Sequence, residues 1–231
     1  MKSFRKSSIS YMSKVAIFAA LSIVLYYVKL PATLIIPVFP EYLDIQFSNL
    51  PAIICGFVVG PVGGVTVVVI RSLIKLPFTG TLGVGELADL VIGVSCVLIS
   101  SLVYKKEHTK TGGIIALVCA FVSWVVFAAI ANWLIIIPSY MKLFHLDAGY
   151  FVNLLSFVNG VTEQNFMLYY ILAVAIPFNA MLAFIVCVIT YFVYKRVSKL
   201  MQKLDGKFVD GETEIVDNDS QSDPNNLSEK F

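Results

Sequence analysis

The sequence predicts an all-α integral membrane protein whose six transmembrane helices leave both termini in the cytoplasm. Three observations support this fold class. Hydrophobic residues make up 58% and charged residues 14% of the 231 residues, and the mean hydropathy is +0.84. Several runs of roughly 20 residues carry almost no charge, which is long enough to cross a hydrocarbon core of about 30 Å. Basic residues gather in three clusters outside these runs, as expected of cytoplasmic segments.

Four apolar runs are predicted to cross the membrane once each. The first contains the stretch Val15–Val28, which we interpret as a span and not as a cleaved signal peptide because no small-residue cleavage site follows it. Within it, Ala16 and Ala20 lie four residues apart on one helix face. This spacing lets a second helix approach closely, either inside the bundle or on a partner subunit. The four runs are Lys14–Leu30, Leu82–Tyr104, Gly113–Ile137 and Asn165–Tyr194.

A fifth run, Pro51–Leu76, is predicted to cross the membrane twice. As one straight helix it would be roughly 39 Å long, more than a single crossing needs. Its middle is Gly60–Gly64, a glycine- and proline-rich stretch that disfavours a continuous helix. We therefore expect a helical hairpin with its turn at Gly60–Gly64. The first arm would recruit Leu43–Leu50, and the second would end near Pro77.

The basic clusters favour the same interpretation. With five spans, the first and last clusters would lie on opposite sides of the membrane, whereas with six spans all three lie on one side, the cytoplasmic side. The clusters are Lys2, Arg5, Lys6 and Lys14; Lys105, Lys106 and Lys110; and Lys195, Arg196, Lys199 and Lys203.

Residues 204–231 are predicted to be a disordered acidic tail in the cytoplasm. From Leu204 onward, eight Asp and Glu residues stand against two Lys and Arg residues, and there is too little apolar surface to form a core. The predicted domains are therefore a six-helix transmembrane domain at 1–203 and this tail.

The sequence has few features of a catalytic site or a metal site. The two histidines, His108 and His145, fall in predicted loops, and the four cysteines lie singly inside apolar runs. No metalloprotease, serine hydrolase or nucleotide-binding motif is present, so we predict neither an enzyme nor a metal site. An autonomous carrier coupled to an ion stays open as an alternative, with Asp89 or Glu86 as the coupling residue.

Polar side chains gather towards the predicted outer ends of the spans, which indicates a pocket that opens outwards. The outer segments in this topology are Pro31–Gln46, Pro77–Thr81 and Pro138–Gln164. The polar residues are Glu41, Asp44, Asn49, Lys75, Thr79, Glu86, Asp89, Asn132 and Gln164.

Two asparagines inside apolar runs, Asn132 and Asn179, are the strongest candidate ligand-binding residues. An amide offers donors and acceptors without the solvation cost of a charge, but it can equally form an interhelical hydrogen bond. The neighbouring Trp133, Tyr140 and Phe178 could supply flat surfaces for an aromatic ligand, although interfacial anchoring explains the first two equally well.

Five segments together resemble the substrate-binding S component of an energy-coupling factor (ECF) vitamin transporter, and they are most similar to its riboflavin-specific branch. The segments run from the first span to the last and leave out the acidic tail. They are "AIFAA", "YLDIQFSNLPAIICGFVVGPVGG", "LPFTGTLGVGELADLVIG", "NWLIIIPSY" and "IPFN".

The resemblance implies six helices in the bacterial cytoplasmic membrane and capture of a vitamin at the outer face. The S component then docks on a transmembrane coupling subunit that is driven by two ATPase subunits, so ATP is hydrolysed by the partners. It needs no cofactor of its own and binds no nucleic acid. By the same match, Ala16 and Ala20 form the docking surface. Another vitamin, such as folate, thiamine or pantothenate, is the alternative ligand.

The resemblance also implies a set of ligand-binding residues for riboflavin or a related flavin. Asn132 and Asn179 would contact the isoalloxazine ring, and the outer loop around Leu43–Phe47 would close above it. At one position this chain departs from the riboflavin branch, which commonly has a lysine where Leu182 stands. The predicted ligand-binding residues are Asn132, Asn179, Leu43, Asp44, Phe47, Glu86, Thr79 and Lys75.

Overall fold

A computed structural model describes the chain except for residues 1, 29, 32–42, 108 and 198–231. By its contacts the chain divides into residues 1–194 and residues 195–231. The predicted boundary at 203/204 and the acidic tail lie outside the described residues.

The described chain is mostly helical, with one short antiparallel strand pair that the all-α prediction missed. In this pair, Leu30 is opposite Ile45 and Pro31 is opposite Asp44. η2 is a 3₁₀ turn, whereas η3 and η4 are π-helical, and a helix follows η4 from residue 176. The elements are α1 (Lys2–Tyr27), β1 (Leu30–Pro31), β2 (Asp44–Ile45), α2 (Asn49–Val58), α3 (Pro61–Lys75), η2 (Leu76–Phe78), α4 (Val84–Lys106), α5 (Lys110–Ala131), η3 (Asn132–Ile136), α6 (Ile137–Leu143), α7 (Ala148–Leu154), α8 (Phe166–Tyr170) and η4 (Ile171–Ala175).

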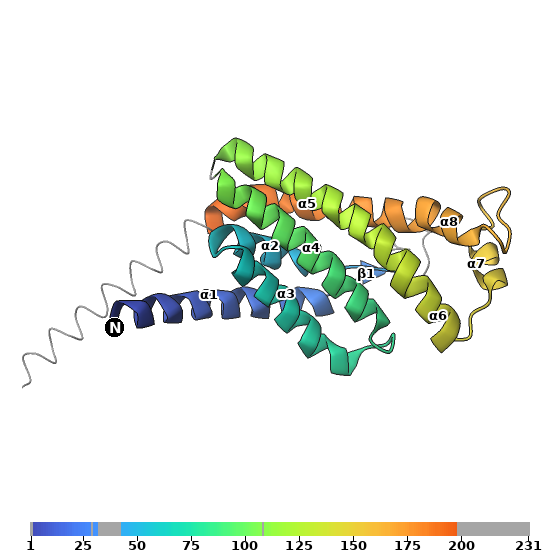
Figure 1. Ribbon diagram of the computed structural model, residues 1–231, viewed down its shortest axis with the longest axis horizontal. Helices are drawn as coiled ribbons and strands as arrows, with labels where there is room; N and C mark the ends of the chain where they lie inside the picture. The colour runs from blue at the N-terminus through green and yellow to red at the C-terminus, as the bar shows by residue number, and fades with distance from the viewer. Residues whose placement is uncertain (1, 29, 32–42, 108, 198–231) are drawn as a thin grey trace, which may run out of the picture. The chain divides into compact units, whose positions relative to one another are not determined.

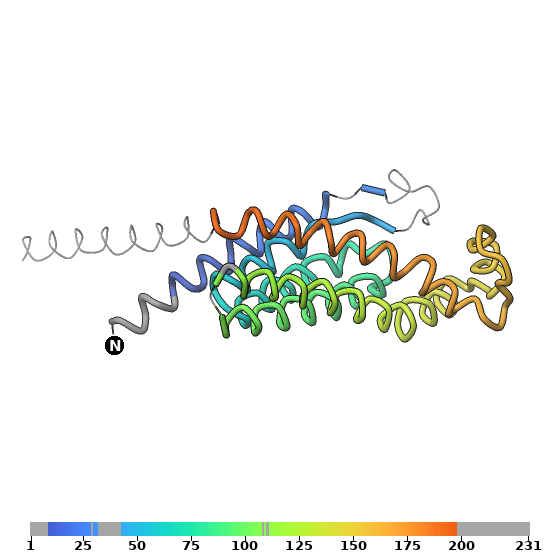
Figure 2. The backbone as a smooth tube through the Cα atoms, turned by 90° about the horizontal axis from the view of Figure 1, so that it is seen from above, coloured from blue at the N-terminus to red at the C-terminus, as the bar shows by residue number. Residues whose placement is uncertain are grey.

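Five helical stretches of the described chain are long and apolar enough to cross a membrane, where six were predicted. The missing one is α2, whose ten residues cover only about 15 Å of the roughly 30 Å hydrocarbon core. Successive helices alternate in direction within residues 1–194 (Figures 1 and 2). The five stretches are Ile9–Tyr27, Pro61–Phe78, Val84–Lys106, Thr111–Leu143 and Phe166–Val197.

α2 and α3 form the predicted hairpin, but its turn is shorter than expected. The chain reverses at Val59–Gly60, where Gly60 has φ 116°, a conformation that favours glycine. Pro61 then begins α3, as proline often does at a first helical position. Gly63 and Gly64 lie inside α3 and not in the turn, which corrects the prediction. A Cβ on Gly64 would lie 2.8 Å from Gly56 Cα, so the missing side chain lets the two arms touch.

The segment before α2 is extended and does not join the first arm, which contradicts the predicted recruitment of Leu43–Leu50. β2 covers Asp44–Ile45, and α2 begins only at Asn49. Ile45 and Ser48 are 1% and 0% exposed, and Ser22 of α1 donates a 2.6 Å hydrogen bond to the Ser48 carbonyl. Non-helical backbone is tolerated at membrane depth when protein surrounds it in this way.

A π-helical turn precedes the proline in each of the last two long helices. The N–H of Ile137 donates to the carbonyl of Asn132, and that of Ile176 donates to the carbonyl of Ile171, each five residues back. A helical proline lacks an N–H and crowds the preceding turn, and the wider π turn relieves this crowding. The first of these helices therefore continues past Ile137 to Leu143, so the predicted outer loop from Pro138 is helical where it starts.

Candidate ligand-binding site

A cavity of about 190 Å³ lies between α1, α4, α5 and the helix that starts at residue 176. It is at the end of the bundle that carries the β1–β2 pair, the end opposite the α2–α3 turn (Figure 1). The cavity is lined by Tyr26, Leu43, Asp44, Gln46, Thr81, Gly85, Glu86, Ala88, Asp89, Ile92, Trp124, Asn132, Ile136, Tyr140, Tyr170, Ala175, Phe178, Asn179 and Leu182.

Both predicted asparagines line this cavity. The Asn132 amide donates to the Ala128 carbonyl at 2.8 Å, and the Asn179 amide donates to the Ala175 carbonyl at 2.9 Å. These bonds to the preceding turn fix the direction of each side chain. An amide has two N–H groups and two lone pairs, so each asparagine keeps hydrogen-bonding capacity for a ligand.

The aromatic wall of the cavity differs from the predicted one at one position. Tyr140 and Phe178 line the cavity as expected, whereas Trp133 is 47% exposed and turned away. Trp124 takes its place: it is 3% exposed, and its Nε1 donates to Asn179 Oδ1 at 3.2 Å. The sequence carried a signal for this, because Trp124 precedes Asn132 by eight residues and so lies on the same helix face.

Glu86 presents a carboxylate that two threonines hold in place. Thr79 Oγ1 donates to Glu86 Oε2 at 2.6 Å, and Thr81 Oγ1 donates to the same oxygen at 3.0 Å. Thr79 Oγ1 in turn accepts the N–H of Gly83 at 3.1 Å, which ties the loop before α4 to the carboxylate. Thr79 therefore positions Glu86 and does not itself line the cavity.

Arg71 anchors Asp89, one of the three acidic residues that line the cavity, and was not among the predicted ligand-binding residues. Its side chain is 0% exposed and lies 2.9 Å from Asp89 Oδ2. The same guanidinium donates to Ser48 Oγ and Asn49 Oδ1, at 2.9 Å each. A charge inside an apolar run was the available signal, because such residues are costly and usually functional.

Gln46 connects this network to the cavity. Its Nε2 lies 3.5 Å from Asp89 Oδ1, and its Oε1 is buried without a hydrogen-bond partner in the described chain. A buried polar atom without a partner is costly, so Gln46 Oε1 is a candidate acceptor for a ligand donor.

The structure thus brings together five of the eight predicted ligand-binding residues: Asn132, Asn179, Leu43, Asp44 and Glu86. Phe47, Thr79 and Lys75 do not line the cavity. The Lys75 ammonium lies 4.5 Å from the Tyr27 ring centroid and 5.6 Å from that of Tyr26. Among the described residues no cluster of metal-binding side chains occurs, and the four cysteines are free.

Ala16 and Ala20 lie on the exposed face of α1. The opposite face carries Phe18 and Ser22, which are 2% and 0% exposed and pack inside the bundle. Among the described residues of the bundle, both alanines are thus exposed. Docking of this face on another molecule stays a prediction.

A family model described as the substrate-specific component of ECF transporters matches residues 10–194. The chain belongs to this family. As an S component with several apolar helices, it is a multi-pass membrane protein of the cell membrane. A solved S component of a bacterial ECF transporter has the same fold, with a TM-score of 0.65 at 23% identity over 84% of this chain and 98% of that chain.

Two relatives of this S component carry the name of a flavin transporter. Riboflavin transporter RibU of Staphylococcus aureus (strain TCH60) is 26% identical over 191 residues, which cover 82% of this chain and 91% of the relative. Riboflavin transporter FmnP of Bacillus subtilis (strain 168) is 27% identical over 137 residues, which cover 58% and 70%.

Proposed function

We propose that this S component binds riboflavin or a closely related flavin in the Asn132–Asn179 cavity and delivers it for import. The observation that carries the proposal is the convergence of two buried amides with Trp124, Tyr140 and Phe178 in one cavity. A flavin combines a flat apolar ring, a donor-acceptor edge on its pyrimidine ring and a chain of hydroxyl groups. The names of the relatives support the same ligand.

The polar lining suits the two ends of this ligand. The amides of Asn132 and Asn179 can pair with the pyrimidine edge, because each edge atom needs a complementary donor or acceptor. Carboxylates only accept hydrogen bonds, so Asp44 and Glu86 can receive the hydroxyl groups of the ribityl chain. Acidic residues are thus compatible with a neutral ligand.

Binding requires the cavity to widen. Sites for vitamin-sized molecules usually measure about 300–1,000 Å³, whereas this cavity measures about 190 Å³. Trp124 and Asn179 both line the cavity and are joined by a hydrogen bond of 3.2 Å. A flavin ring that inserts beside Asn179 would displace this bond. The π turns next to both asparagines give the two helices local freedom to adjust, since such turns are less regular than α-helix.

We also propose six membrane passes with both chain termini in the cytoplasm. The alternation of helix directions and the three basic clusters support this topology. Energy would come from partners: a transmembrane coupling subunit docked on the Ala16–Ala20 face and two ATPase subunits.

The absorption spectrum of the protein purified from flavin-replete cells tests the ligand class. We expect a yellow protein with flavin bands that survive extensive washing, because a buried ligand with many paired groups dissociates slowly. A colourless protein that also gives no spectral shift with added riboflavin would contradict the proposal.

A further inference from the structure

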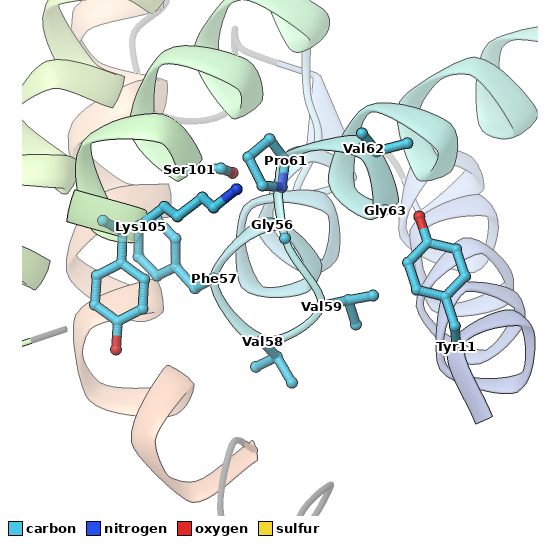
Figure 3. Close-up of a pocket in the computed structure, with 12 residues that line it drawn as sticks. Tyr11, Gly56, Phe57, Val58, Val59, Pro61, Val62, Gly63, Ser101 and Lys105 are labelled. Carbon is cyan, nitrogen blue, oxygen red and sulfur yellow. The ribbon is translucent and has the colours of Figure 1, made fainter. Parts of the chain in front are cut away.

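A second polar cavity lies at the α2–α3 turn, at the opposite end of the bundle from the Asn132–Asn179 cavity. It measures about 410 Å³ and lies between the α2–α3 turn, Tyr11 of α1 and the end of α4. Figure 3 shows Lys105 and Ser101 of α4 beside Pro61, with Tyr11 of α1 on the other side of the turn. None of the residues that line it is acidic.

The first turn of α3 contributes positive potential to this cavity. α3 has 15 residues and begins at Pro61, and no side chain caps its N-terminus. The first N–H groups of a helix have no partner inside it, and together with the helix dipole they favour an anion. Here those groups belong to Val62 and Gly63, both of which line the cavity.

Ser101 supplies an independent indication that a ligand binds here. The residue is 1% exposed, and its Oγ has no hydrogen-bond partner in the described chain. Figure 3 shows this oxygen turned towards the Lys105 ammonium and Pro61. A buried hydroxyl without a partner is costly unless something outside the chain accepts its hydrogen.

Lys105 and Tyr11 complete a set of hydrogen-bond donors. Lys105 is an exposed residue that lines the cavity, and its ammonium lies beside Ser101 and Pro61 (Figure 3). The Tyr11 hydroxyl lies close to Gly63, 3.5 Å from where a Cβ on that glycine would be. One ammonium, two hydroxyls and two backbone N–H groups therefore surround a space that no carboxylate of the described residues lines, which matches the chemistry of a phosphate group.

We propose that this cavity binds the phosphate group of an anionic phospholipid. The apolar rim favours a lipid over a free phosphate ion: Val58, Val59 and Val62 line the same cavity, and Val62 is 72% exposed. These side chains can contact the glycerol and upper acyl region while the phosphate reaches Lys105. The basic clusters place this end of the bundle at the cytoplasmic leaflet of the membrane. Anionic lipids are enriched in that leaflet, and basic pockets between helices on that side bind their head groups.

Native mass spectrometry of the full chain in detergent tests this proposal with three probes: phosphatidylglycerol, diacylglycerol and inorganic phosphate. We expect phosphatidylglycerol to bind at least about tenfold more tightly than diacylglycerol, which lacks the phosphate, because charge-assisted hydrogen bonds are lost. Millimolar inorganic phosphate should not displace it. Equal binding of the two lipids, or displacement by phosphate, would overturn the lipid assignment.

Variants locate the bound lipid. Lys105→Gln should weaken phosphatidylglycerol binding about tenfold, and Ser101→Ala should weaken it severalfold without removing charge. Lys106→Gln is the matched control, because Lys106 is an exposed neighbour that does not line the cavity. Equal losses for the Lys105 and Lys106 variants would mean general attraction to a basic surface and would contradict the site. An unchanged melting temperature shows that each variant is folded.

Discussion

Asn132 and Asn179 are the residues on which ligand recognition depends in our proposal. Replacing either by alanine should leave a buried ligand group unpaired, at a cost of about 1–3 kcal/mol, or roughly 5- to 150-fold in affinity. Calorimetry with riboflavin measures the loss. Asn153→Ala is the control, because Asn153 is exposed on α7 and away from the cavity. If both cavity variants bind riboflavin as tightly as the parent, the asparagines only pack the helices.

Arg71 should be a positioning residue whose removal costs stability as well as binding. Arg71→Met leaves Asp89 without its 2.9 Å ion-pair partner, and breaking a buried pair from one side typically costs about 3–5 kcal/mol. Thermal unfolding in detergent measures this cost.

The double variant Arg71→Met/Asp89→Leu separates the two roles of the pair. It should recover most of the lost stability, because both charges are then gone. Riboflavin affinity should stay low, since Gln46 loses the Asp89 carboxylate that orients it. A double variant that binds riboflavin like the parent would show that the network serves folding alone.

For single residues, the sequence predicts the two asparagines of the cavity better than the tryptophan that lies beside them. An amide inside an apolar run is a signal by itself, and both asparagines line the cavity. The choice between Trp124 and Trp133 depends on helix phase, and the π turn starting at Asn132 shifts that phase. The pairing of Arg71 with Asp89 depends on how α3 packs on α4, which the sequence pattern does not contain.

The exposed alanine face of α1 should mediate docking on the coupling subunit. Ala20→Trp should abolish co-purification with the transporter partners and leave riboflavin binding intact, because close helix approach needs small side chains at the contact. Phe184→Trp is the control, since Phe184 is 62% exposed on another helix. Normal assembly of the Ala20→Trp variant would exclude this face as the docking surface.

The α2–α3 hairpin determines which side of the membrane each later segment occupies. In a variant whose native cysteines are replaced, Tyr150→Cys should react with an impermeant thiol reagent added to intact cells. Val62→Cys and Lys106→Cys should react only after the membrane is permeabilised, although Val62 is 72% exposed. External labelling of Val62→Cys would mean that this turn faces outwards and would invert the topology.

At the element scale, composition predicts the hairpin but not its details. The Gly-Pro pair and the charge clusters are sufficient to predict a reversal. They do not reveal that Gly63 and Gly64 serve helix packing, because a glycine in a turn and a glycine at a contact look alike in sequence. The extended Asp44–Ile45 pairs with Leu30–Pro31, and that pairing depends on contacts distant in the chain.

For the whole molecule, the two proposed sites lie at opposite ends of one bundle: a flavin cavity near the β1–β2 pair and a phosphate cavity at the α2–α3 turn. The sequence predicts both the membrane class and the family. Long apolar runs indicate the membrane class, and the family motifs are spread over the same region that the family model matches, residues 10–194. The second cavity could not be predicted, since its parts come from α1, α2, α3 and α4.

Calorimetric titration of the purified chain with riboflavin, folate, thiamine and pantothenate tests whether the Asn132–Asn179 cavity selects a flavin. Riboflavin should bind with one-to-one stoichiometry and at least about a thousandfold more tightly than the other three. A site built to pair buried polar groups rejects ligands that leave those groups unpaired. Tighter binding of folate, thiamine or pantothenate than of riboflavin, or no binding of riboflavin at all, would contradict the account.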